Sequence, residues 1–365
     1  MMTDNQHTQN EVLNQSNLQN PPTPENEAAF SAFISEKKEE EKDFKKLLYL
    51  LSFTVIAVLL LQRLLIYALV KFFEMTASAG AADTAHTAEP VISEFLENFI
   101  FFLLWFVNHL VIFVPSFLVF GLAFRKRVSF QRACPSYEFK KSWILPAFLA
   151  SYFLSAAAIF ISNFIEYILR PVFGSDGLRD VFENIMPQTL PQVITMLILV
   201  GVVGPICEEL IYRHFLLRAL RRYGDLTAVI ITSLLFGFFH GNLTQFLYTA
   251  SAGVICAIVA IRANSVIPAI ILHVINNLYF VLLDVFYDVA QSSESLVLET
   301  VSLVLPWALV IIGLFCFIYF CVKGRFKVEN ANPYIMAAER VRTIFENPLV
   351  LVMIVFLIAD TIRGS

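Results

Sequence analysis

The chain has 365 residues, of which 58% are hydrophobic and only 15% charged, and its mean hydropathy is +0.69. About a quarter of the residues in soluble globular domains are charged, so this composition excludes that class and indicates a polytopic membrane protein. The net charge of -4 gives no reason to expect a nucleic-acid partner. The five cysteines show neither a disulfide framework nor a zinc-type spacing.

The first 46 residues are polar. Residues 1–34 are rich in Asn, Gln, Thr and Pro, and we expect a disordered tail because they offer too little apolar surface to bury. Residues 35–46 are densely charged and predict a juxtamembrane helix. The first long apolar run begins only near Leu47, after a leader too long for a signal peptide, so it predicts a retained first span.

Apolar runs that could cross the ~30 Å hydrocarbon core of a bilayer, which takes about 20 helical residues, recur from Leu47 onward. They lie at 47–70, 96–123, 142–168, 190–212, 226–245, 246–263, 266–286 and 301–322. We therefore expect an all-α transmembrane bundle of about eight spans over 47–323. A cytoplasmic tail should follow at 324–365. Its short apolar run, 349–362, could be an interfacial helix, a re-entrant piece or a ninth span.

Basic residues set the expected orientation. If the N-terminus is inside, the inside segments carry 21 Lys and Arg residues and the outside loops carry three. This bias predicts that both termini are cytoplasmic. The basic loop 125–141 should contact anionic lipid headgroups, so membrane lipids are expected partners. The Asn/Gln-rich leader and the Phe-rich spans are typical of AT-rich bacterial genomes, which favours a bacterial cell membrane.

Two carboxylates and a guanidinium interrupt the fourth run at Glu208, Glu209 and Arg213. An ionisable group inside a span costs several kcal/mol unless it is paired, so it marks a functional site by default. Glu209 and Arg213 are spaced i, i+4 and can pair, which predicts a structural brace. Glu208 points about 100° away and has no basic partner on its own helix, so it stays available to a water molecule or a metal ion.

A histidine follows in the next run. His240 comes one helical turn after Phe236, which we expect to serve in packing. Gly237 and Gly241 flank the histidine, and we expect both glycines to let a neighbouring backbone approach closely.

The seventh run places His273 and Asn277 on one helical face, at i and i+4. At a rise of ~1.5 Å per residue from the cytoplasmic ends, these two residues, Glu208 and His240 all lie about 14 to 20 Å deep. Three runs therefore bring a carboxylate, two imidazoles and an amide to one level. We expect a buried catalytic site that opens to the cytoplasm.

Three motifs stand in one order along the chain: Glu208-Glu209-Leu-Ile-Tyr-Arg213, Phe236-Gly-Phe-Phe-His240 and His273-Val-Ile-Asn-Asn277. They closely resemble the CPBP family of CAAX proteases and bacteriocin-processing enzymes, also called Abi proteins, which includes the type II CAAX prenyl endopeptidase. That family's pattern is Glu-Glu-x-x-x-Arg, Phe-x-x-x-His and His-x-x-x-Asn, each on its own transmembrane helix. The resemblance covers residues 190–286.

The resemblance implies an intramembrane endopeptidase that hydrolyses membrane-associated or peptide substrates. In that reading Glu208 activates a water with the help of His240, while His273 and Asn277 donate hydrogen bonds to the developing oxyanion. The family is also described as metal-dependent, and Glu208, His240 and His273 would make a zinc set. The sequence does not separate a metal hydroxide from a water activated by Glu208, and it does not name the substrate or say whether prenylated proteins are cleaved.

Two other classes of function stay open: a non-catalytic membrane binding or immunity protein of the same fold, and a proton- or metal-coupled transporter. A lone intramembrane His or Asn often serves only as an interhelical hydrogen-bond donor or acceptor. The other intramembrane proteases fit worse, because His-Glu-x-x-His, Gly-x-Ser-Gly and Gly-x-Gly-Asp motifs are all missing from the sequence.

Overall fold

The computed structural model describes residues 24–80, 90–128, 137–173, 187–329, 332 and 334–363, and within these ranges it contains helices and no strand. The α-helices are α2 (Pro24–Gly80), α3 (Pro90–Val128), α4 (Ile144–Phe173), α5 (Leu190–Ile198), α6 (Gly204–Glu209), α7 (Arg218–Arg221), α8 (Asp225–Phe238), α9 (Leu243–Ala263), α10 (Ile267–Ser292), α11 (Leu296–Val322), α12 (Ala337–Phe345) and α13 (Pro348–Arg363). A 3-10 turn, η2 (Lys141–Trp143), and two π-helical segments, η4 (Leu199–Val203) and η5 (Leu210–Leu217), complete the set. The expected all-α transmembrane bundle is confirmed.

Seven helices in the described ranges are long and apolar enough to cross a membrane, and the bent pair α12–α13 would make an eighth. The run 226–245, expected as a separate fifth span, is not one helix but is divided between α8 and the start of α9. Helix α8 ends at Phe238, and Asn242 then caps α9 by accepting a hydrogen bond from the backbone N–H of Gln245 at 2.7 Å. The 14 residues of α8 rise only about 21 Å, so α8 is too short to cross alone.

Helix α2 is a single helix of 57 residues that starts earlier than expected. Residues 24–34, predicted to belong to the disordered tail, are helical, whereas residues 1–23 of that tail lie outside the described residues. Proline fits the first turn of a helix, and Ala28 and Ala29 are strong helix formers. The charged segment 35–46 is helical and continues into the apolar run without a break.

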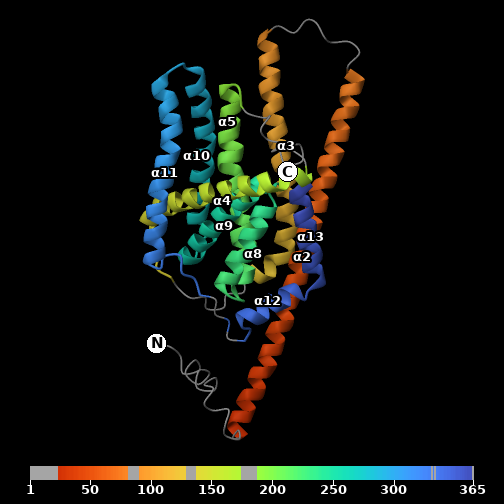
Figure 1. The fold of residues 1–365 in the computed structure, drawn as a ribbon. Helices are drawn as coiled ribbons and strands as arrows, with labels where there is room; N and C mark the ends of the chain where they lie inside the picture. The colour runs from red at the N-terminus through yellow and green to blue at the C-terminus, as the bar shows by residue number, and fades with distance from the viewer. Residues whose placement is uncertain are drawn as a thin grey trace.

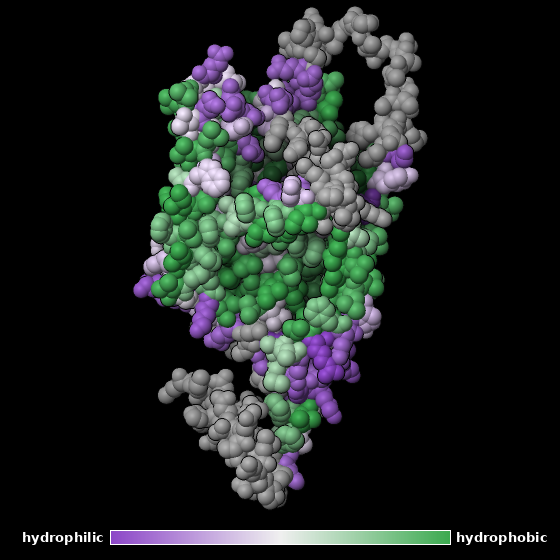
Figure 2. Space-filling model, viewed as in Figure 1, coloured by the Kyte–Doolittle hydropathy of each residue, from purple (hydrophilic) through white to green (hydrophobic). Residues whose placement is uncertain are grey.

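The long helices do not all run side by side. Figure 1 shows α10 and α11 next to each other, while α4 crosses them steeply and packs against α9 and α11. A side chain at Gly313 of α11 would collide with the carbonyl of Leu149, so the missing Cβ allows this close crossing. In Figure 2 hydrophobic residues cover the middle of the visible face and hydrophilic residues gather toward its two ends, as a membrane protein requires.

A network of charged residues joins three segments at the basic end of the molecule. Arg222 donates to Asp43 at 3.0 Å and also pairs with Glu40, which is buried. Arg127 of α3 and the Tyr223 hydroxyl bind the same Asp43 at 3.0 to 3.2 Å and 2.7 Å. The network fixes α2 against α3 and against the turn after α7.

Helix α13 lies along α2, and α12 runs across α2 (Figure 1). The apolar run at 349–362 forms α13, which meets α12 at a bend of 73°, as in a broken span or a re-entrant loop. Lys37 of α2 pairs with Glu339 of α12 at 2.6 Å, and Arg63 of α2 forms an ion pair with Asp360 of α13. These contacts place the end of the chain against its first span.

Candidate active site

The first motif lies on a helix whose hydrogen-bond pattern changes twice. Helix α6 carries Glu208 and Glu209, with the π-helical segment η4 before it and η5 after it. A π-helical segment adds a residue to a turn, so it rotates the side chains that follow relative to an uninterrupted α-helix. Such segments occur frequently at functional sites.

Glu209 is completely buried and has two partners. Its Oε2 atom lies 3.2 Å from Nε of Arg213, so the ion pair predicted from the i, i+4 spacing is present. Its Oε1 atom lies 3.0 Å from Nδ1 of His273 in α10, a contact that the sequence did not indicate. Arg213 also donates from Nη2 to the carbonyl of Gly253 at 3.2 Å. The brace therefore connects the first motif to the third.

The Glu209 carboxylate determines how His273 is oriented. An ionised carboxylate can only accept, so Nδ1 of His273 carries the proton in this contact. The other ring nitrogen, Nε2, then faces Glu208, whose Oε2 atom is 3.6 Å away. The Glu208 side chain keeps 23% of its surface exposed, whereas Glu209 keeps none. The two adjacent glutamates thus differ: Glu208 is partly exposed, and Glu209 is buried and forms the predicted ion pair with Arg213.

His240 lies just beyond the end of α8, and not inside a spanning helix as expected. Its backbone N–H donates to the carbonyl of Gly237 at 3.1 Å, and its Nδ1 atom is 2.8 Å from the carbonyl oxygen of Phe236. A carbonyl can only accept, so Nδ1 is the donor and Nε2 keeps its lone pair. His240 is therefore held in a tautomer that can accept a proton or a hydrogen bond at Nε2.

The ring of Phe236 lies at the centre of the three motifs. It contacts the imidazole of His240 with a centroid distance of 4.9 Å and that of His273 at 5.5 Å, both edge-on. The Arg213 guanidinium lies 5.2 Å from the ring centroid, and the Tyr212 ring packs edge-on at 5.1 Å. Phe236 is buried, and its packing role is what brings residues of three helices into one cluster.

The two glycines beside His240 serve different purposes. A Cβ atom on Gly237 would lie 2.7 Å from the carbonyl oxygen of Phe246 and 2.9 Å from Cβ of Ala250, so this glycine does allow close approach of α9. The same expectation is wrong for Gly241, which has open space around it. Its φ of +73° is the left-handed conformation that favours glycine, and it lets the chain turn between α8 and α9.

Asn277 joins α10 to the π-helical segment η4. Its Nδ2 atom donates to the carbonyl of Val200 at 3.0 Å and retains a second N–H. The Nδ2 atom of the adjacent Asn276 lies 3.5 Å from Oδ1 of Asn277. The Oδ1 atom of Asn276 is buried and has no hydrogen-bond partner in the described part of the chain. The sequence favoured Asn277 over Asn276, and Asn277 is the one that contacts the first motif's helix.

His109 of α3 is a neighbour of the site that belongs to none of the three motifs. Its Nε2 atom lies 3.0 Å from the carbonyl of Leu199 in η4, and its Nδ1 atom lies 2.8 Å from the carbonyl of Trp105. A neutral imidazole donates to one of these two carbonyls, and Asn277 donates to the next carbonyl of η4, that of Val200. The position of His109 in the middle of an apolar run could have indicated that it belongs to the site.

The residues of the possible zinc set do not form a metal-binding group in this structure. Across the described ranges, no three His, Cys, Asp or Glu side chains come together in a group that could hold a metal ion. Glu208, His240 and His273 share one cluster but do not form such a group.

Comparison with known proteins agrees with the motifs. Residues 190–279 match the family described as "Type II CAAX prenyl endopeptidase Rce1-like". A Bacillus subtilis (strain 168) protein described as "Putative membrane peptidase YdiL" is 28% identical over 136 residues, which are 37% of this chain and 54% of the relative. The chain thus aligns with about half the length of this curated relative. No solved structure matches. The segment that carries all three motifs, residues 190–279, is thus the part of the chain that is similar to this family.

Proposed function

We propose that this chain is an intramembrane endopeptidase that hydrolyses peptide bonds in membrane-associated proteins or peptides. The observation that carries the proposal is the approach of a partly exposed carboxylate oxygen of Glu208 to Nε2 of His273, at 3.6 Å inside a buried polar cluster. A polar cluster of this kind is expensive inside a membrane and is expected to serve a function. The family match of residues 190–279 supports a peptidase over a transporter.

Glu208 is the proposed general base. It takes a proton from a water molecule, and the water oxygen forms a bond to the carbonyl carbon of the substrate. The electron pair of the C=O double bond moves to the oxygen. When the tetrahedral intermediate collapses, the C–N bond breaks and the proton held by Glu208 passes to the leaving nitrogen. Nε2 of His240 accepts a hydrogen bond from the same water and so helps to position it.

His273 and Asn277 are the proposed donors to the oxyanion. Glu209 lies against Nδ1 of His273 and stabilises the imidazole when Nε2 also carries a proton. The second N–H of the Asn277 amide is the other donor. Donors fixed in a poorly hydrated site stabilise developing negative charge without further reorganisation, which contributes most to such reactions.

We further propose that the end of the bundle that carries Arg127 and Arg222 faces the cytoplasm of a bacterial cell, as the distribution of basic residues predicts. Substrate would then reach Glu208 from that side. Labelling of single cysteines introduced at the exposed positions Arg125 and Val297, at opposite ends of the bundle, checks this assignment in intact cells. Labelling of Arg125→Cys from outside the cell would contradict it.

The proposed function is tested by comparing membrane proteins in cells that express wild-type or Glu208→Gln protein. Wild-type protein should generate new protein N-termini, and the variant should generate none while it retains uncleaved substrates during purification. Glu299→Gln at the start of α11, which is exposed, is the matched control and should behave as wild type. Equal cleavage by wild-type and Glu208→Gln protein, both folded, would falsify the mechanism. Cleavage by purified wild-type protein should also survive chelation of divalent metal ions.

A further inference from the structure

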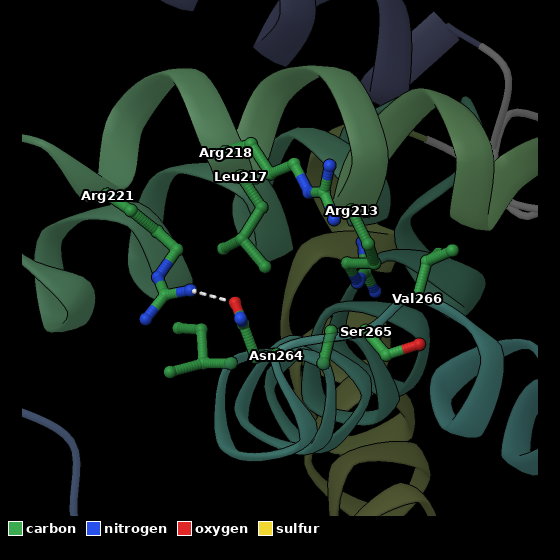
Figure 3. Close-up of a pocket in the computed structure, with 9 residues that line it drawn as sticks. Arg213, Leu217, Arg218, Arg221, Asn264, Ser265 and Val266 are labelled. Atoms are coloured by element: carbon green, nitrogen blue, oxygen red, sulfur yellow. Dashed lines mark hydrogen bonds between the residues drawn. The ribbon is translucent and has the colours of Figure 1, made fainter. Parts of the chain in front are cut away.

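A pocket lined by three arginines lies beside the candidate active site, between the end of the first motif's helix and the turn from α9 to α10. Figure 3 shows the side chains of Arg213, Arg218 and Arg221 leaving one helix toward the turn that carries Asn264 and Ser265. The pocket is narrow and partly open, with Arg218 exposed at its rim and Arg213 buried at its inner end. It therefore leads from the surface to the brace of the candidate site.

The positive charge in this pocket exceeds the negative charge around it. Glu209 pairs with Arg213, and Asp225 pairs with Arg221 through contacts of 2.7 and 3.3 Å. Arg218 has no hydrogen bond or ion pair with any residue in the described ranges. Three guanidinium groups thus face two carboxylates, and one positive charge is left over.

Arg213 lies at the inner end of the pocket and is not itself available to a ligand. Its side chain is only 1% exposed, pairs with Glu209 and donates to the carbonyl of Gly253. A ligand that enters from the surface therefore meets the arginines nearer the rim, Arg218 and Arg221.

The chemistry that fits is a phosphate group. Guanidinium groups bind phosphate oxygens through paired hydrogen bonds, and the charge balance of the pocket calls for about one negative charge. The pocket also lies at the end of the bundle that carries Arg127 and Arg222, where a membrane surface would place lipid headgroups. We propose that the rim of this arginine pocket binds the phosphate group of an anionic phospholipid through Arg218 and Arg221.

Two variants change the pocket without touching the candidate catalytic residues. Arg218→Gln removes the unbalanced charge at the exposed rim. The Ser265 hydroxyl accepts a hydrogen bond from the backbone N–H of Ile267 at 3.3 Å. Ser265→Asp keeps an oxygen that can accept this bond but adds a negative charge inside the pocket. Arg125→Gln at the end of α3 and Ser295→Asp at the N-cap of α11 make the same chemical changes away from the pocket.

The test is calorimetric titration of the full purified chain in uncharged detergent with short-chain phosphatidylglycerol, phosphatidylcholine or inorganic phosphate. Phosphatidylglycerol should bind most tightly, and each pocket variant should weaken its binding about tenfold, the usual effect of losing one charged hydrogen bond. Both control variants should bind as the wild type does. Equal binding of phosphatidylglycerol and phosphatidylcholine, or unchanged binding by both pocket variants, would overturn the site. Inorganic phosphate binding as tightly as phosphatidylglycerol would overturn the assignment to a lipid. The result does not depend on cleavage, so it is independent of the proposed peptidase activity.

Discussion

Glu209 and His273 are joined by a hydrogen bond of 3.0 Å between a side chain of α6 and one of α10. The bond turns Nε2 of the imidazole toward Glu208, so the buried Glu209 orients the ring that contacts the partly exposed Glu208. Second partners of this kind fix the tautomer and the orientation of histidines at many functional sites. Glu209 is therefore a positioning residue as well as the partner of Arg213.

Glu209→Gln should affect both stability and cleavage. It leaves the buried Arg213 guanidinium without its counter-charge, and breaking one side of a buried pair costs about 3–5 kcal/mol. It also replaces the carboxylate beside Nδ1 of His273 with a neutral amide, which can still accept the hydrogen bond but no longer stabilises a protonated imidazole, so kcat should fall about 100-fold or more while KM changes little. Thermal unfolding in detergent and cleavage kinetics measure the two effects.

The double variant Glu209→Gln with Arg213→Gln is the control for Glu209→Gln. It removes both charges of the pair, so it should be more stable than the single variant and equally inactive. If the single variant retained wild-type kcat, His273 would not need the negative charge of Glu209.

Asn277→Ala should be more harmful than Asn276→Ala. The first substitution removes the donor to the Val200 carbonyl in η4, and a buried carbonyl without a partner costs about 1–3 kcal/mol. Among the described residues, the Asn276 side chain has only the 3.5 Å contact with Asn277, so its loss should cost less. The melting temperatures of the two variants and their cleavage rates give the comparison, and equal losses in both would count against the role assigned to Asn277.

Gly237→Ala should weaken the packing of α8 against α9. The new methyl group would lie 2.7 Å from the carbonyl oxygen of Phe246, an overlap that requires the two helices to move apart, at a cost of about 1–3 kcal/mol. His240 comes directly after α8, so cleavage should also decrease. Gly241→Ala is a useful contrast because its methyl group meets open space, and only its left-handed backbone conformation adds about 1–2 kcal/mol. A Gly237→Ala protein as stable as the wild type would show that the helices tolerate the methyl group.

The ion pair between Arg63 and Asp360 should attach α13 to α2. Arg63→Asp places two carboxylates in contact, so the C-terminal helix should become more accessible to protease. Asp360→Arg in the same chain restores an ion pair with its charges exchanged and should restore protection. Limited proteolysis of purified protein with a C-terminal tag follows both changes, and protection unaffected by Arg63→Asp would mean that apolar packing alone holds α13.

The features predicted from the sequence were those that depend on spacing along one helix. The Glu209–Arg213 pair followed from an i, i+4 spacing, and so did the common face of His273 and Asn277. The Glu209–His273 bond and the central position of Phe236 depend on how different helices approach each other, which helical periodicity does not encode. The end of α8 could have been anticipated, because glycine followed by asparagine at 241–242 is typical of a turn that leads into a capped helix.

Because the helix of the first motif contains the π-helical segments η4 and η5, its number of residues determines the direction in which Glu208 points. Each π-helical turn contains about one residue more than an α-helical turn, and one residue corresponds to about 100° of rotation around a helix. Deletion of a single residue from Leu199–Val203 would let the helix become regular, and Glu208 would then point away from His273 although every motif residue remained. A relative that keeps all three motifs but lacks one residue in this segment should therefore have lost the geometry of the site.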